Sequence, residues 1–245
     1  MREWKNIAVI TPMGDIDIAS TPALREELDA RILEGTRRIL VNCRRVTFID
    51  STGLAFLLSR ARRLAQRDGM RSLVGVSSDV ARILEIARLL DVLHVSTAER
   101  PAIPALERGM SPIWSKTMNI AGDVGQLGYY RHRVVEMLGG VRLSREDCFD
   151  MALAVGEALG NAYDHTPGKD IVMEVSAYLD RVVVEVKDTG AGFELAPDEL
   201  PEETEERGRG IRLMRLLVDR VDVELRRDVR GTVVRLTKLL QTRRS

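Results

Sequence analysis

Residues 157–165 read Glu-Ala-Leu-Gly-Asn-Ala-Tyr-Asp-His and overlap the end of a long helix predicted over 145–163. Polar side chains recur there at i, i+4, i+7 and i+8, a spacing that places them on one stripe of the helix. They are Glu157, Asn161, Asp164 and His165. A carboxylate and an amide one turn apart can orient a nucleophile and hold Mg²⁺, which prefers oxygen ligands. Taken alone, the helix favours the reading of these side chains as ordinary surface polar residues.

Three glycine-containing segments further along the chain favour a ligand site. Residues 188–192 read Asp-Thr-Gly-Ala-Gly after an apolar strand, residues 208–210 read Gly-Arg-Gly before a helix, and Gly231-Thr232 opens the last predicted strand. Glycine lets the backbone approach a ligand closely, and N–H groups at a helix N-terminus suit a phosphate. A carboxylate at a strand end can accept a hydrogen bond from an exocyclic amine. Each segment alone is also compatible with an ordinary loop or turn.

Taken in order, the four segments resemble the boxes of the Bergerat ATP-binding fold, which type II topoisomerases, Hsp90, histidine kinases and MutL share. The resemblance covers nearly all of residues 117–240, and within the group residues 157–165 look most like the anti-sigma-factor serine kinases. It implies that Glu157 is the general base, that Asn161 binds Mg²⁺ and that Asp188 contacts the adenine amino group of ATP. Further nucleotide contacts are implied for Gly190, Gly192, Gly208, Gly210 and Thr232.

The same resemblance assigns roles to side chains outside the glycine segments. Arg131, on the helix predicted over 124–138, matches an arginine with which these kinases meet their partner, although Arg133 lies only two residues away. His165 is typical of the family segment, and we expect it to be structural rather than a phospho-acceptor. A histidine kinase is the weaker alternative, because no paired-helix dimerisation domain with an exposed histidine precedes the ATP-binding region. A topoisomerase-like or chaperone-like ATPase would need additional domains.

A second motif lies in the N-terminal half. Residues 48–54 read Phe-Ile-Asp-Ser-Thr-Gly-Leu, at the point where a predicted strand becomes a helix. Asp and Ser are both common N-caps, so Ser51 could serve only as a helix cap. Within its strand–helix context the segment resembles the STAS domain of anti-sigma-factor antagonists, over about residues 4–100. That resemblance implies phosphorylation of Ser51, with Thr52 as a neighbouring alternative, and a serine phosphatase that resets it.

The pattern of predicted elements gives an α/β half followed by an α+β half. The first half alternates strands and helices, which predicts a STAS-like sheet with helices packed on it. The second half has two helices, two strands, a helix and two strands, which predicts a Bergerat-type α/β sandwich with a mostly antiparallel sheet. We expect domains at 1–100 and 117–245, with a proline-containing linker at 101–116. The C-terminal strands are predicted over 171–177, 182–188, 221–226 and 232–237.

Composition restricts the function further. Lys plus Arg and Asp plus Glu both number 37 in 245 residues, so the formal net charge is zero and a broad nucleic-acid surface is not expected. The two cysteines cannot build a disulfide framework, and we recognise neither a signal peptide nor a membrane-spanning run. These observations favour a cytoplasmic protein.

Together the two resemblances predict a partner-switching regulator of transcription. Its C-terminal domain would be an ATP- and Mg²⁺-dependent protein serine/threonine kinase and anti-sigma factor, and its N-terminal domain an antagonist-type substrate phosphorylated on Ser51 in cis or in trans. Expected partners are a sigma factor, separate STAS or kinase proteins, or a second copy in a homodimer. The alternative is a non-catalytic binding module that sequesters partner proteins and whose affinity is tuned by nucleotide.

Overall fold

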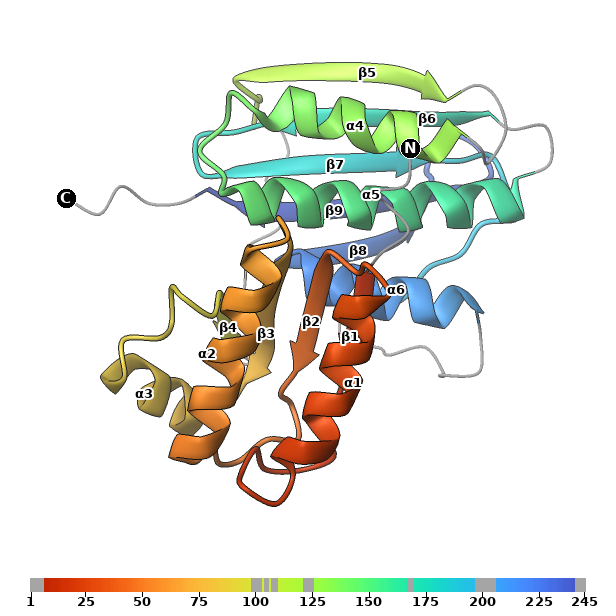
Figure 1. The fold of residues 1–245 in the computed structure, drawn as a ribbon. Coiled ribbons are helices and arrows are strands. Elements are labelled where there is room, and N and C mark those ends of the chain that lie inside the picture. The colour runs from red at the N-terminus through yellow and green to blue at the C-terminus, as the bar shows by residue number, and fades with distance from the viewer. Residues whose placement is uncertain are drawn as a thin grey trace. The chain divides into compact units, whose positions relative to one another are not determined.

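The computed structural model describes residues 7–97, 103, 106, 110–120, 126–166, 170–196 and 206–240, with backbone alone at 206, 207 and 209. The chain divides into two compact units, residues 1–101 and 102–245 (Figure 1). We describe each unit by itself. Of the predicted linker, Pro101 and Pro104 lie outside the described residues.

The N-terminal unit is a four-stranded parallel sheet in the order β1-β2-β3-β4. Its strands are β1 (Ile7–Ile10), β2 (Arg38–Asn42), β3 (Met70–Val76) and β4 (Val95–Thr97). Three helices connect them: α1 (Thr21–Leu33), α2 (Ser51–Ala65) and α3 (Ser78–Ile86). Apolar side chains of all three helices join those of the sheet in one buried cluster, as the predicted α/β pattern requires. The sequence analysis did not include β4, which has only three residues.

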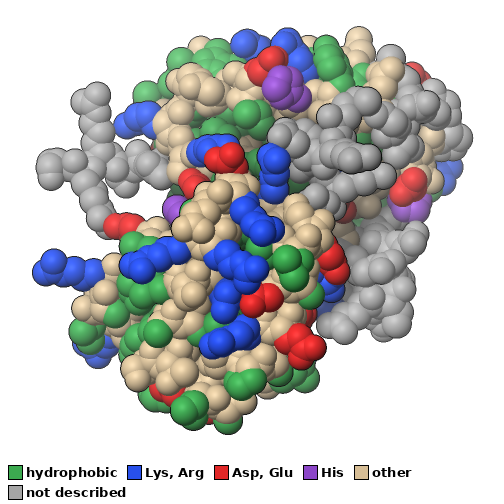
Figure 2. All heavy atoms as spheres, viewed as in Figure 1, with side chains coloured by type: hydrophobic (Ala, Val, Ile, Leu, Met, Phe, Trp, Pro, Cys, Tyr) green, Lys and Arg blue, Asp and Glu red, His purple; other side chains and the backbone are tan. Residues whose placement is uncertain are grey.

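Ion pairs tie α1 to α2 on the surface of this unit. Arg60 and Arg63 lie one turn apart on α2, and both contact Asp29 of α1, at 3.2 and 2.8 Å. Figure 2 shows basic side chains over these two helices, whose only basic residues are arginines. Such partly exposed pairs contribute little to stability, about 0–1 kcal/mol each. The apolar cluster beneath them therefore dominates the packing.

The C-terminal unit is a five-stranded antiparallel sheet in the order β5-β6-β7-β9-β8. Its strands are β5 (Trp114–Ile120), β6 (Ile171–Ala177), β7 (Arg181–Lys187), β8 (Arg220–Leu225) and β9 (Thr232–Leu239). Its helices are α4 (Leu127–Leu138), α5 (Arg145–His165) and α6 (Glu206–Leu217). Helix α5 packs against α4, α6 and strands of the sheet, which explains its nearly continuous buried face. This is the predicted helix-covered antiparallel sheet.

Strand β5 is a second element, besides β4, that the sequence analysis missed. It begins at Trp114, inside the predicted linker, and pairs along its whole length with β6. Ser115, Lys116 and Thr117 are exposed on this edge strand, so the sequence lacks the apolar alternation of a half-buried strand. The first predicted C-terminal helix starts at Leu127 in the structure, and residues 121–125 lie outside the described residues.

Two further features concern the whole described chain. Cys43 and Cys148 are free thiols, and Cys43 is buried. Burial raises the pKa of the Cys43 thiol to about 12, so this sulfur stays protonated. Among the described residues, no helix combines the length and the apolar character that crossing a membrane requires.

Candidate nucleotide site and phospho-acceptor loop

Helix α5 supplies the first part of the site. Ser144 caps its N-terminus, because the serine hydroxyl oxygen accepts a hydrogen bond from the Asp147 backbone N–H at 3.0 Å. Glu157 and Asn161 are half-buried one turn apart, whereas Asp164 and His165 at the end of the helix are exposed. The helix therefore places the carboxylate and the amide on the stripe that the spacing predicts.

Asp188 follows β7 directly and is held by backbone groups from two segments. Its Oδ1 accepts hydrogen bonds from the N–H groups of Gly190 at 2.8 Å and Thr232 at 3.2 Å. The Asp188 N–H in turn donates to the Thr232 carbonyl at 3.0 Å. The other carboxylate oxygen, Oδ2, accepts no hydrogen bond from any described residue. Asp188 is only 7% exposed, so this oxygen is a nearly buried acceptor.

Close backbone contacts explain two of the glycines. A Cβ on Gly190 would lie 2.4 Å from the His165 carbonyl oxygen, and one on Gly231 would lie 2.0 Å from the Asp188 carbonyl oxygen. Gly231 also has φ +151°, which side chains of L-residues rarely adopt. Both positions require glycine because the loops after α5, β7 and β8 meet there.

Helix α6 brings the third glycine segment to α5. Gly208 and Gly210 are buried in its first turns. A Cβ on Gly210 would lie 3.3 Å from Asn161 Nδ2 and 3.4 Å from Glu157 Oε2. The absence of a side chain at Gly210 therefore keeps the space beside the Glu157 carboxylate and the Asn161 amide open.

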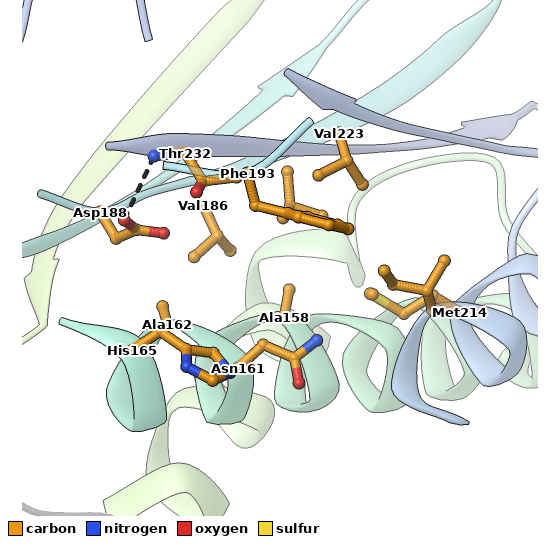
Figure 3. A pocket seen from close by; sticks show the side chains of 12 residues that line it. Ala158, Asn161, Ala162, His165, Val186, Asp188, Phe193, Met214, Val223 and Thr232 are labelled. Atoms are coloured by element: carbon orange, nitrogen blue, oxygen red, sulfur yellow. Dashed lines mark hydrogen bonds between the residues drawn. The ribbon is translucent and has the colours of Figure 1, made fainter. Parts of the chain in front are cut away.

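A pocket joins these segments and holds about 420 Å³ of space between atoms, including space open to solvent. Its lining is shown in Figure 3, with Asp188 and Met214 at opposite ends and Phe193 between them. His165, expected to be structural, also lines it. The lining comes from α5, β7, β9, β8, α6 and the loop after β7: Ala158, Asn161, Ala162, His165, Val186, Asp188, Phe193, Ile211, Met214, Val223, Thr232 and Val234. An apolar cleft with a few polar groups is the usual form of a small-molecule site.

Glu157, Gly190, Gly192, Gly208, Gly210 and Arg131 are not part of this lining. Gly210 lies beside Asn161, which lines the pocket, and beside Glu157. Gly190 is joined to the lining residue Asp188 by a hydrogen bond. Gly192 has φ +84° in the loop that leads to Phe193. Arg131 lies on the α4 side of α5, against Gly156. The structure thus brings Asn161, Asp188 and Thr232 into one pocket with Gly190 and Gly210 beside it, and Arg131 is not part of the lining.

The charges around Glu157 act in opposite directions. Burial raises the pKa of the Glu157 carboxyl above its ordinary value, and the positive charge of Arg131 partly opposes this effect. Burial likewise lowers the pKa of the Arg131 guanidinium, and Glu157 opposes that shift. The carboxylate is therefore a stronger proton acceptor than an exposed glutamate.

The predicted phospho-acceptor lies at the start of α2. Asp50, not Ser51, is the N-cap, since Asp50 Oδ1 accepts a hydrogen bond from Gly53 N–H at 2.7 Å. Ser51 is exposed, and its side chain forms no hydrogen bond with any described residue. Thr52 is half-buried. A helix-cap role for Ser51 is therefore not what the structure shows.

A loop on the other side of this motif fixes its geometry. Asp50 Oδ2 accepts a hydrogen bond from Ile18 N–H at 3.1 Å, and a Cβ on Gly53 would lie 2.2 Å from the Ile16 carbonyl oxygen. The side chains of Ile18 and Phe48 are 72% and 49% exposed, so apolar surface accompanies Ser51. The sequence analysis missed this loop, because its contact depends on the fold.

Comparisons with known proteins agree with the two units. Residues 1–102 match the STAS domain, and residues 120–238 match the histidine kinase-like ATPase domain. The anti-sigma-B factor antagonist of Staphylococcus aureus (strain NCTC 8325 / PS 47) is 37% identical over 83 residues, which are 34% of this chain and 77% of that protein. The protein of the same name from Staphylococcus epidermidis is 35% identical over the same shares.

A solved structure of the anti-sigma factor antagonist SpoIIAA in its unphosphorylated form matches with 24% identity and a TM-score of 0.35, covering 38% of this chain and 82% of that one. The sequence matches carry the assignment, because they span most of the antagonists' length and most of the C-terminal unit. The chain therefore belongs to the STAS-domain anti-sigma-factor antagonists through its N-terminal unit. Its C-terminal unit is a histidine kinase-like ATPase domain of the Bergerat type, which is also called GHKL.

Proposed function

We propose that this partner-switching regulator is an ATP- and Mg²⁺-dependent protein serine kinase and anti-sigma factor fused to its own antagonist-type substrate, and that it phosphorylates Ser51 in cis or in trans. One observation carries the proposal: Asn161, Asp188 and Thr232, from three separate segments, line one pocket, with the Glu157 carboxylate beside it.

The pocket suits the adenine end of ATP. The unpaired Asp188 Oδ2 is an acceptor for the amino group of adenine, and the apolar side chains around it accommodate a flat ring. The backbone of Gly208 and Gly210 in the first turns of α6 provides a place for phosphates, because N–H groups at a helix N-terminus favour anions. Gly190 and Gly192 belong to the loop that shapes the pocket beside Asp188.

The protein ligands beside the pocket suit a cation that is coordinated mainly by the phosphates of ATP. Among the described residues, no group of three or more His, Cys, Asp or Glu side chains could hold a metal ion. Mg²⁺ commonly combines few protein oxygens with substrate phosphates, so the Asn161 amide oxygen is a sufficient ligand from α5. The bound cation would neutralise charge on the transferring phosphate.

The proposed reaction is phosphoryl transfer to an alcohol. The Ser51 Oγ forms a bond to the γ-phosphorus while the bond from that phosphorus to the β,γ-bridging oxygen breaks, and ADP leaves with the electron pair. Glu157 accepts the proton of the Ser51 hydroxyl. Its raised pKa suits this role, because a general base works best when its pKa approaches the working pH.

Phosphorylation would then control protein contacts. We propose that the unmodified N-terminal unit binds kinase or anti-sigma proteins, and that a serine phosphatase restores this state. A sigma factor is the proposed client of the C-terminal unit, and Arg131 remains a candidate contact for it. A second copy of the chain is the proposed partner if phosphorylation occurs in trans.

Mass spectrometry of the full-length chain after incubation with Mg-ATP tests the proposal. We expect one added phosphate at Ser51, none in Ser51→Ala, and continued labelling of Thr52→Ala. Glu157→Gln should bind ATP, but its rate of phosphoryl transfer should fall by a factor of about 10² or more. If wild type binds ATP and never gains phosphate, the binding-module alternative is correct.

The same assay separates cis from trans transfer. A Glu157→Gln chain is mixed with a Ser51→Ala chain, so that one has the acceptor and the other the base. Phosphate on the Glu157→Gln chain then comes from its neighbour. If neither chain is labelled although wild type is, transfer occurs in cis.

A further inference from the structure

The side chain of Arg131 does not extend freely from α4. It lies across α5 at Gly156, where a Cβ would be 1.9 Å from Arg131 Nε and 2.5 Å from its Cζ and Nη2. Any residue other than glycine at position 156 would place its Cβ where the guanidinium lies. Arg131 is accordingly half-buried, whereas its neighbours His132 and Arg133 are exposed and contact Glu136 on their own helix.

The next residue of α5 is the candidate general base. Glu157 has α4 with Arg131 on one side and α6 with Gly210 on the other, where Oε2 lies 3.4 Å from the position of a Gly210 Cβ. Asp164 and His165 are two turns further along α5, and Asp188 is held by the loops at Gly190 and Thr232. Burial raises the pKa of the Glu157 carboxyl, and the positive charge of Arg131 partly opposes that rise.

We propose that Arg131 is a positioning residue for phosphoryl transfer: seated on the bare face of Gly156, its guanidinium fixes the packing of α4 on α5 at the residue before Glu157 and places a positive charge near that carboxylate. The inference rests on the proposed kinase function and deepens it. It differs from a role of Arg131 in partner contact, since it places the effect of the residue on the base of its own chain.

Two variants remove this arrangement in different ways. Arg131→Met removes the charge but retains a long apolar stem, and Gly156→Ala displaces the guanidinium while the charge remains in the chain. Arg131→Lys keeps a positive charge as the conservative replacement. Gly160→Ala is the matched control, because it lies one turn along the same helix and its Cβ would meet nothing within 4 Å.

The assay is the rate of Ser51 phosphorylation by the full-length chain as a function of ATP concentration and pH. For Arg131→Met and Gly156→Ala we expect kcat to fall about 10-fold with little change in the KM for ATP. Without the opposing charge of Arg131, the acid limb of the kcat profile should move to higher pH in Arg131→Met. In Arg131→Lys the acid limb should lie close to its wild-type pH, because the positive charge is retained. Gly160→Ala should match wild type in kcat and in its pH profile.

The outcomes separate the two levels of the proposal. If wild type transfers no phosphate, the proposed function fails and the inference fails with it. If wild type is active but Arg131→Met keeps both its kcat and its acid limb, only the inference is overturned. An Arg131→Met variant that weakens binding of a partner protein while the acid limb stays fixed also overturns it, in favour of the partner-contact role.

Discussion

Replacing Asp188 by Asn tests the adenine contact with the smallest change in shape. In the wild type Oδ1 accepts the N–H groups of Gly190 and Thr232, and Oδ2 is left for a ligand. The amide oxygen of Asn can keep the Oδ1 position, so the two loops stay together. Its NH₂ group then takes the Oδ2 position and presents a donor to the amino group of adenine, which is also a donor. We therefore expect the variant to fold but to bind ATP more weakly than wild type.

The size of the loss follows from the buried position of Asp188. Mg-ATP at 100 times its Kd adds about 2.7 kcal/mol to the free energy of unfolding. Losing a hydrogen bond to a charged group costs about 1.5–3 kcal/mol, which is roughly 10–150-fold in Kd. At the same ATP concentration the variant should gain only about 0.3–1.3 kcal/mol. Since 1 kcal/mol corresponds to about 2–4 °C, the gain in Tm falls by at least about 3 °C.

Thermal unfolding with and without Mg-ATP measures this difference directly. Asp164→Asn is the matched control, because it makes the same chemical change at an exposed carboxylate outside the pocket. Mg-GTP provides a second comparison, since its ring has a carbonyl oxygen where adenine has the amino group. The adenine role of Asp188 is refuted if Asp188→Asn unfolds like wild type without ligand and retains the full gain in Tm with Mg-ATP.

Three other predictions concern Gly53, Asn161 and Glu157. Gly53→Ala should lower the free energy of unfolding of the N-terminal unit by about 2 kcal/mol or more in urea, because its Cβ would overlap the Ile16 carbonyl oxygen; an unchanged midpoint contradicts the close contact. Asn161→Ala should weaken ATP binding with Mg²⁺ present but not with EDTA, as calorimetry would show; equal losses would exclude a ligand role. Burial raises the folded-state pKa of Glu157, so its stabilising effect is complete below the unfolded pKa and is lost as pH rises through the folded value. Glu157→Gln should therefore gain stability over wild type toward neutral pH and not at acid pH, and a pH-independent difference would contradict this.

Local patterns in the sequence predict the main elements because their apolar residues repeat with one period. Strand β6 has the expected bounds, and α5 runs two residues beyond its predicted end. The stripe of Glu157 and Asn161 was predictable from spacing alone, because a regular helix fixes which positions share a face. Strand β5 was not, since its pairing with β6 determines it more than its own residues do.

Contacts between segments distant in sequence account for the rest of the site. The hydrogen bond from the Thr232 N–H to Asp188 forms because β9 lies beside β7 in the sheet. The order of strands in a sheet cannot be predicted from their order along the chain. The seat of Arg131 on Gly156 depends on how α4 crosses α5. A glycine inside an otherwise helical pattern was the available signal, because such a glycine often marks a close packing contact.

A phosphate on Ser51 would change the surface of the N-terminal unit without requiring it to refold. Both Asp50 oxygens already accept backbone N–H groups, from Gly53 at 2.7 Å and Ile18 at 3.1 Å, so the helix cap does not depend on the serine hydroxyl. The N-terminus of α2 also favours added negative charge. The cost falls on a partner that covers the exposed Ile18 and Phe48, because about −1.5 to −2 charges would be desolvated beside the Asp50 carboxylate. One modification would thereby weaken a contact while the fold that presents it persists, which is the property that partner switching requires.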